Sequence, residues 1–468
     1  MVSEIKESES LPSQSAAKSN KLYVFFCHAY SSVMYSLYEI EVPKPLPPTP
    51  DEATQADEIK NPKKLLPVLE LQTGRYPDGM SCVSLGSKLY FFGGEFNMDN
   101  PYIGEDVKKN FKPSDCDVFP RQLRILDLSD VGARGDELHK LLVDGEKLRS
   151  GKARPHAFVA EEKIYVIGST IESSISHRSK LLRIKNLESF KFFEVYDPKV
   201  DKWDVLLDPP IGNVKTRWVG HTIVRRTAFL VAWQGGKKCL YCFDLVKRTW
   251  TGASIPFYPE KFSGRTEFVE DTLYGCYRNT IAAIAPVEET KIEKEEKKGK
   301  VEGQKMEAEK VKAKETVEAE EGQGWLLKNL RLHVLSEEMG MDAIFNVPPQ
   351  LQSSSSLLHL GDRKFCYVKS GMPPNSDNDS DDVIKDDRKR FISIVIFQDL
   401  GKKYKNDGTG LLQAKFHYSA HYEINSLVPN EGFINGCFFP SSVMSFMPSC
   451  SFLHNLLSIV VVNILIVN

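Results

Sequence analysis

A short apolar run recurs six times along the chain, and no other feature restricts the fold as strongly. Each copy begins with Lys or Thr and continues with hydrophobic residues, most often with an aromatic residue third. The copies begin at Lys21, Lys88, Lys163, Thr227, Thr272 and Lys364. One such unit cannot bury its own apolar face, so the copies must stack on one another. The chain is therefore expected to repeat one supersecondary element.

Each copy is part of a larger unit of short strands. A shorter run precedes four of the copies, beginning at Gly79, Pro155, Gly220 and Thr266. A third run follows three copies, as in RILDL, FEVYD and LYCFDL, and after two of these a tryptophan occurs at a constant distance. Four short strands joined by turn residues predict an antiparallel meander. Such sheets arranged radially form a β-propeller.

The ordered pattern of these runs resembles the kelch repeat. The best copy contains Arg154-Pro155-His156, then KIYVIG, then Tyr196-Asp197-Pro198 and Trp203. Gly93-Gly94 matches the glycine doublet of that family, whereas Gly168-Ser169 matches it in part and the last two copies lack it. The resemblance implies an all-β, six-bladed kelch-type propeller of four-stranded blades. It also implies binding of a partner protein as the usual role.

The count of six blades depends on how the ring closes. A ring of sheets leaves open edges unless its first and last strands share one blade. The first copy, at Lys21, has no strand run before it, and the run GFINGCFF from Gly432 is the natural closing strand. We therefore expect a propeller over residues 21–440, a disordered N-terminus over 1–20 and an apolar tail over 441–468. The charged stretch 288–321, rich in Glu and Lys, is expected to be an insertion between two strands of the fifth blade.

Composition narrows the function classes. The chain is 41% hydrophobic and 26% charged, with a formal net charge of −2, so it offers no general nucleic-acid surface. Nine cysteines scattered among the strands are typical of reduced thiols, and the N-terminus has no apolar signal segment. We expect a monomeric cytoplasmic or nuclear protein.

Residues with catalytic or metal-binding potential are few. Cys239 and Cys242 have CxxC spacing, but residues three apart on a strand point to opposite faces. His417 and His421, four apart on a strand, are expected to share a face, yet no carboxylate or third ligand is near in sequence. His156 and His221 occupy matching positions of two units and are interpreted as structural. No P-loop, dinucleotide, GxSxG or HExxH motif occurs, so we expect neither catalysis, a cofactor nor a metal.

Four arginines form the candidate binding site. Arg75, Arg154, Arg217 and Arg265 are each expected just before the first strand of a unit, which predicts a position near one end of a central channel. Guanidinium groups there could bind carboxylates or phosphates in a bidentate manner. The alternative is that these arginines only join neighbouring blades by hydrogen bonds. A large loss of thermal stability on their replacement would favour that alternative.

Three function classes follow. The favoured one is a non-catalytic interaction module or adaptor that binds an unidentified protein partner through the face with the long loops (95–120, 129–153, 170–191, 336–353 and 370–389). Plant kelch propellers often recruit substrates to ubiquitin ligases, but about twenty polar N-terminal residues cannot hold an F-box, so such a role needs another subunit. The second is a metal-dependent enzyme, as in galactose-oxidase-like propellers. The third is a membrane-tethered scaffold, suggested by the tail SFLHNLLSIVVVNILIVN, which has no basic flank and contains polar interruptions.

Overall fold

The computed structural model describes most of the strand-forming chain. It covers residues 20–28, 31–44, 62–97, 100–110, 118–130, 141–170, 191–212, 214–251, 262–277, 280–286, 330–335, 354–371, 389–404, 410–425 and 433–439. The expected N-terminal segment before Asn20, the charged insertion, the apolar tail and most of the long loops lie outside these residues.

The described chain is almost entirely β, in three separate four-stranded sheets and one larger sheet. The first sheet has the order β25 (Phe433–Phe438), β1 (Asn20–Cys27), β2 (Val33–Val42), β4 (Pro67–Gln72). The second is β5 (Ser81–Leu85), β6 (Lys88–Phe92), β7 (Leu123–Asp127), β8 (Val143–Gly145). The third is β9 (Ala153–Ala160), β10 (Lys163–Ser169), β11 (Phe193–Asp197), β12 (Lys202–Val205).

The larger sheet contains three further antiparallel meanders of the same kind. They are β13 (Thr216–Val224), β14 (Thr227–Gln234), β15 (Lys237–Asp244), β16 (Thr249–Thr251); β17 (Phe262–Val269), β18 (Thr272–Tyr277), β19 (Thr280–Pro286), β20 (Leu330–Leu335); and β21 (Ser354–Gly361), β22 (Lys364–Gly371), β23 (Lys389–Tyr404), β24 (Gly410–Asn425). Parallel pairings of β13 with β17 and of β20 with β24 join them. The short strand β3 (Lys63–Lys64) pairs with β24, and α2 (Glu105–Asn110) and the 3-10 turn η1 (Leu128–Asp130) are the described helices.

The six repeated runs of the sequence are β1, β6, β10, β14, β18 and β22, each the second strand of its meander. The predicted C-terminal strand forms as well, since β25 pairs antiparallel with β1 from Tyr23–Phe438 to Cys27–Phe433. β19 ends at Pro286 and β20 begins at Leu330, and the charged insertion 288–321 between them lies outside the described residues.

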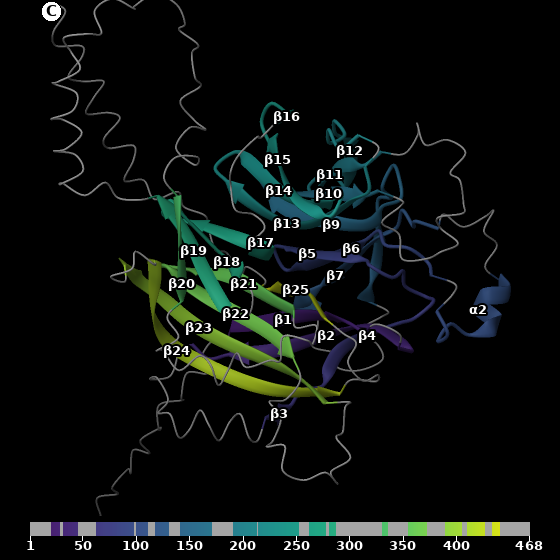
Figure 1. Cartoon of the computed structure of the whole chain (residues 1–468). Helices are drawn as coiled ribbons and strands as arrows, with labels where there is room; N and C mark the ends of the chain where they lie inside the picture. The colour runs from purple at the N-terminus through teal and green to yellow at the C-terminus, as the bar shows by residue number, and fades with distance from the viewer. Residues whose placement is uncertain are drawn as a thin grey trace, which may run out of the picture.

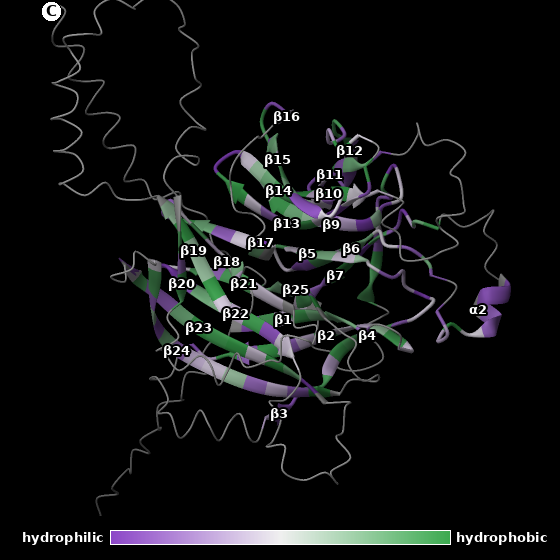
Figure 2. Cartoon of the chain, viewed as in Figure 1, coloured by the Kyte–Doolittle hydropathy of each residue, from purple (hydrophilic) through white to green (hydrophobic). Residues whose placement is uncertain are grey.

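The second strands are apolar on both faces because each is packed between two neighbouring sheets. In β1, Tyr23, Phe25 and Cys27 pack in a core shared with β5, β6 and β7. Leu22, Val24 and Phe26 face the opposite way, into a core shared with β22, β23 and β24. Burial of each such side chain stabilises the fold by about 1.5–3 kcal/mol. Figure 2 shows hydrophobic segments in many of the strands, interrupted by hydrophilic ones, in contrast to the hydrophilic helix α2 at the edge.

The first strands of the meanders contact one another in sequence. β5 contacts β9, β9 contacts β13, β13 contacts β17 and β17 contacts β21; β21 in turn contacts β25, which contacts β5. Figure 1 shows these strands toward the middle of the molecule and the fourth strands β12, β16 and β24 toward the outside. The residues of the first strands therefore line whatever space lies at the centre.

Candidate functional site

A large, partly open cavity of about 3310 Å³ is lined by the first strands and the turns beside them. Its lining comes from all six strands β5, β9, β13, β17, β21 and β25. Small-molecule sites usually measure about 300–1,000 Å³. A space of this size is better suited to part of a polymer than to a compact metabolite.

Three of the four predicted arginines line this cavity. Arg154 is the second residue of β9, Arg217 is the second residue of β13, and Arg265 is the fourth residue of β17. Arg75 is exposed in the turn after β4 and is not part of the lining. The structure therefore brings Arg154, Arg217 and Arg265 to one cavity and leaves Arg75 outside it.

The backbone at Arg154 has an unusual conformation. Its φ is 37°, although it precedes Pro155, a context that normally holds a residue in the extended region. The pairing of β9 with β10 shifts register here, between Ile167 and Ser169. The Ser169 hydroxyl donates a hydrogen bond of 2.9 Å to the Arg154 carbonyl. Bulges of this type redirect a side chain, and here the redirected side chain is that of an arginine lining the cavity.

The three arginines differ in their charge partners. Arg265 Nε pairs with Glu267 Oε1 at 2.8 Å. Among the described residues, neither Arg154 nor Arg217 makes an ion pair within 4.0 Å. Burial lowers the pKa of the Arg154 guanidinium, and the charge of Arg217 lowers it further, while Glu95 and Asp78 act in the opposite direction. Two like charges thus face the cavity side by side.

Asp78 completes this end of the cavity, together with Asn97, which also lines it. Burial raises the pKa of the Asp78 carboxyl to about 7, and the charge of Glu95 adds to the rise, while Asn97 and Arg154 oppose it. Backbone hydrogen bonds join residues 78 and 95 in both directions, at 2.7 and 2.8 Å. Asp78, Asn97, Arg154 and Arg217 are called the arginine end below.

The glycine doublet of the sequence fits closely behind the arginine end. Gly94 has a φ of 89°, and a Cβ atom there would lie 2.6 Å from the Asp78 carbonyl oxygen. A Cβ at Gly93 would lie 2.5 Å from Pro155 Cγ, directly after Arg154. Both positions therefore need glycine because the chain of β6 passes close to the segments that hold Asp78 and Arg154.

His156 and His221 form a pair on the cavity wall. His156 Nε2 and His221 Nδ1 are hydrogen-bonded at 2.9 Å, and the ring centroids are 5.0 Å apart. Burial lowers the pKa of His156 to about 4. It also holds the pKa of His221 well below 6.5, with smaller effects of His156 and Arg265. The sequence suggested matching structural positions but gave no sign that the two rings touch, because they lie on different strands 65 residues apart.

The other sequence candidates lie apart from one another. Cys242 is buried and Cys239 half-buried on β15, and both are free thiols. His421 is hydrogen-bonded to Ser393 at 2.9 Å. A register shift opposite Ile396 and Phe397 makes β24 irregular between Phe416 and Tyr418, so the regular alternation that was to place His417 and His421 on one face is broken. Within the described ranges no group of three or more His, Cys, Asp or Glu side chains could hold a metal ion.

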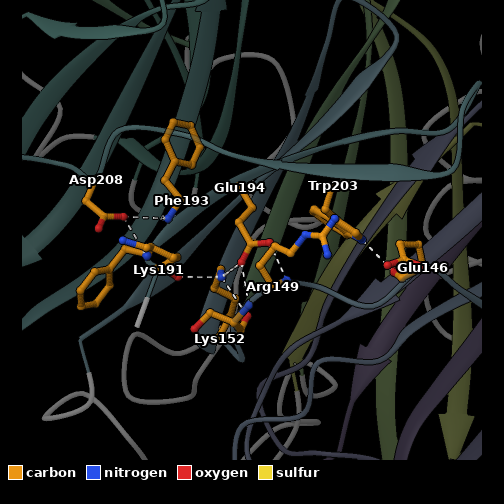
Figure 3. A network of polar contacts seen from close by, with 10 residues as sticks. Glu146, Arg149, Lys152, Lys191, Phe193, Glu194, Trp203 and Asp208 are labelled. Carbon is orange, nitrogen blue, oxygen red and sulfur yellow. Dashed lines mark hydrogen bonds and ion pairs between the residues drawn. The ribbon is translucent and has the colours of Figure 1, made fainter. Parts of the chain in front are cut away.

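A buried ion pair lies on the third sheet, and sequence reasoning did not identify it (Figure 3). Lys152 and Glu194 are fully buried and in direct contact. Lys152 Nζ also donates to the carbonyls of Ser150, at 2.9 Å, and Lys191, at 2.7 Å. Glu194 accepts from the backbone amides of Arg149 and Ser150 at 2.8 and 3.1 Å. This network fixes the segment that leads into β9, and so supports the position of Arg154.

No helix among the described residues is long and apolar enough to cross a membrane.

Comparison with known proteins gives one family match. The family model described as "Protein of unknown function (DUF1668)" matches residues 136–422. No curated protein sequence matches the chain. Among solved structures, "Structure of YjhT" is 12% identical with a TM-score of 0.38 and covers 86% of this chain and 99% of its own. The Pseudomonas aeruginosa periplasmic gluconolactonase PpgL is 11% identical with a TM-score of 0.36 and covers 89% and 98%. We draw nothing about fold or function from likenesses this weak.

Proposed function

Because the chain belongs to the DUF1668 family, whose description assigns no activity, we propose its function from the geometry of the cavity. The protein is a non-catalytic interaction module that binds an acidic segment of a partner protein at the arginine end. The adaptor role comes from the kelch resemblance, and recruitment of substrates to a ubiquitin ligase through another subunit is the form that this resemblance suggests.

One observation carries the proposal: Arg154 and Arg217 face a large cavity with no ion-pair partner among the described residues. Burial lowers the pKa of both guanidinium groups, and the charge of Arg217 lowers that of Arg154 further, so the two groups repel each other. A carboxylate placed between two guanidinium groups would relieve that repulsion and accept charge-assisted hydrogen bonds. The size of the cavity favours a polypeptide segment over a compact ligand.

The fold part of the proposal is a closed, six-bladed kelch-type propeller. Three observations support it: the six repeated second strands, the pairing of β25 with β1, and the sequence of contacts among the first strands that returns from β25 to β5. In such a ring the arginine end would open on the face where the long loops 95–120 and 170–191 emerge.

A reducing compartment, cytoplasm or nucleus, is part of the proposal. Seven described cysteines are free thiols, six of them buried. Burial raises the pKa of Cys242 and Cys276 to about 11, which keeps these thiols protonated and unreactive. A monomeric state and the absence of a cofactor remain proposals of the same kind.

Selection of displayed random peptides on the immobilised protein tests the binding proposal. We expect the selected peptides to be enriched in Asp and Glu. The double variant Arg154→Ala/Arg217→Ala should lose them. The control variant Lys88→Ala/Lys199→Ala changes two cavity-lining residues that pair with Asp127 and Glu162, and it should retain them.

Two results would contradict the proposal. One is selection of peptides without acidic enrichment, or of none above background. The other is equal binding by the Arg154→Ala/Arg217→Ala variant and the wild type. A large fall in the melting temperature of that variant would instead support the alternative that these arginines hold neighbouring sheets together.

A further inference from the structure

The His156–His221 pair lies next to the arginine end on the same two strands. His156 follows Arg154 by two residues on β9, and His221 follows Arg217 by four on β13. The parallel register of β13 and β17 places Arg265 opposite His221. All five side chains line the cavity. The two rings and the three guanidinium groups therefore belong to one wall of the same space.

β13 and β17 approach closely at this wall. A Cβ at Gly220 would lie 2.3 Å from the Gly264 carbonyl oxygen, so only glycine fits there. The Thr266 hydroxyl donates to the His221 carbonyl at 3.2 Å. These contacts fix the backbone of His221, while its ring is hydrogen-bonded to His156 and lines the cavity.

Burial favours the neutral form of the pair when the cavity holds no anion, because it lowers the pKa of both histidines. The charges of His156 and Arg265 lower the pKa of His221 further. The titratable and charged groups that line the cavity on the strands and turns beside the pair are Asp78, Arg154, Arg217, Arg265, Glu267 and His359. Glu267 is paired with Arg265, and the pKa of Asp78 is raised to about 7.

We propose that Arg154, Arg217 and the His156–His221 pair form one oxyanion site, and that the pair takes up a proton from solvent when a doubly charged anion binds. This inference rests on the proposed function, since it places the acidic group of the ligand at the arginine end. A neutral hydrogen-bonded pair has two N–H groups, of which one is shared between the rings and one is left at an outer ring nitrogen. A protonated pair keeps the shared bond, carries a positive charge and has N–H groups at both outer nitrogens, and the anion accepts the additional charge-assisted hydrogen bond.

Proton uptake has a measurable consequence for affinity. If one proton is bound for each anion, the dissociation constant falls about tenfold for each unit of pH decrease, by linkage. Between pH 8 and pH 6 the expected change is up to about 100-fold. Arginines alone remain charged throughout this range and give no such dependence.

Titration calorimetry with two anions tests the inference. The probes are an N-acetylated triaspartate peptide and inorganic sulfate, neither of which titrates appreciably between pH 6 and pH 8, so any proton taken up belongs to the protein. Measurements in two buffers with different heats of ionisation give the number of protons directly. The two probes also distinguish the kind of anion that the site prefers. Binding of the peptide alone, with proton uptake, indicates a carboxylate ligand, and binding of sulfate alone, with proton uptake, indicates a phosphate-like ligand.

The variants separate the pair from the other cavity groups. Because Asp78 at the arginine end has a pKa of about 7 and would itself take up a proton, every protein in this comparison carries Asp78→Asn. With both histidines intact we expect about one proton per bound anion. In His156→Gln or His221→Gln we expect none, and the affinities of these variants should no longer rise as the pH falls. His417→Gln is the matched control, since His417 lines the cavity outside the pair and bonds to Gln398 at 3.3 Å. It should behave as the Asp78→Asn parent, and circular dichroism of each variant verifies folding.

Two outcomes overturn the inference in different ways. Binding of either probe by the Asp78→Asn parent without proton uptake refutes the coupling and leaves the proposed acidic ligand intact. Failure of both probes to bind at any pH between 6 and 8 refutes the oxyanion site, and the peptide selection described above then decides whether the proposed function falls with it.

Discussion

Removal of the Lys152 ammonium group should destabilise the protein strongly, because its partner would remain buried. In Lys152→Met, Glu194 keeps only the backbone amides of Arg149 and Ser150 as donors, and the Ser150 and Lys191 carbonyls lose the Nζ donor. Breaking a buried ion pair from one side usually costs about 3–5 kcal/mol. Both side chains are fully buried, so solvent cannot replace the lost charge.

Urea unfolding followed by tryptophan fluorescence measures this cost. The double variant Lys152→Met/Glu194→Leu should recover much of the loss, since it leaves no unpaired charge. Lys199→Met is the surface control. The ion pair of Lys199 with Glu162 is largely exposed, so its loss should change the urea midpoint very little. A Lys152→Met midpoint equal to that of the wild type would refute the reasoning. So would a double variant no more stable than the single one.

Three further predictions concern other parts of the fold. A chain that ends at residue 432 lacks β25 and should unfold or become protease-sensitive, whereas a chain that ends at residue 439 should not; equal resistance would contradict the closing role of β25. Gly94→Ala should lower the free energy of unfolding by about 1–3 kcal/mol. The loss should exceed that of Gly86→Ala, where φ is also positive but no atom lies within 4 Å of the added Cβ. Equal urea midpoints for the two variants would show that the close approach at Gly94 is unimportant. Asp78→Asn should be more stable than the wild type above pH 7, because the raised pKa of Asp78 shows that its ionised form is unfavourable in the folded state. This difference in stability should disappear as the pH falls toward 4, where Asp78 is protonated in the folded wild type. A difference that does not change with pH would contradict the prediction.

The sequence predicted what repetition and local pattern control. Each second strand is an apolar run long enough to be buried on both faces, so all six could be located without a structure. The pairing of β25 with β1 followed from a missing strand run at the N-terminal end of the repeat. The arginines at 154 and 217 were found because they occupy the same position in two units.

Long-range assembly determines what the sequence did not show. The His156–His221 hydrogen bond and the Lys152–Glu194 ion pair join residues that no local pattern connects. The register shift near His417 breaks the alternation on which its predicted shared face with His421 depended. Arg75 was grouped with the other arginines by its position before a first strand, but the turn that contains it lies outside the cavity lining.

Several departures from regular geometry lie at the wall that we assign to binding, although register shifts also occur elsewhere, as in β2/β4 and β23/β24. The positive φ of Arg154, the register shifts in β9 and β13 and the close approach of Gly220 to Gly264 lie beside the arginines or the histidine pair. Regular strands would bury the same apolar residues, so packing alone does not require these features. Backbone strain persists where surrounding contacts enforce it, and it is concentrated at functional sites in other proteins. Lys152 and Glu194, just before β9 and on β11, supply such contacts, which connects the stability of that buried pair to the geometry of the binding wall. Lys152→Met should therefore weaken binding of the triaspartate peptide even at temperatures where the variant is fully folded. Unchanged affinity at those temperatures would show that the buried ion pair does not control the geometry of the binding wall.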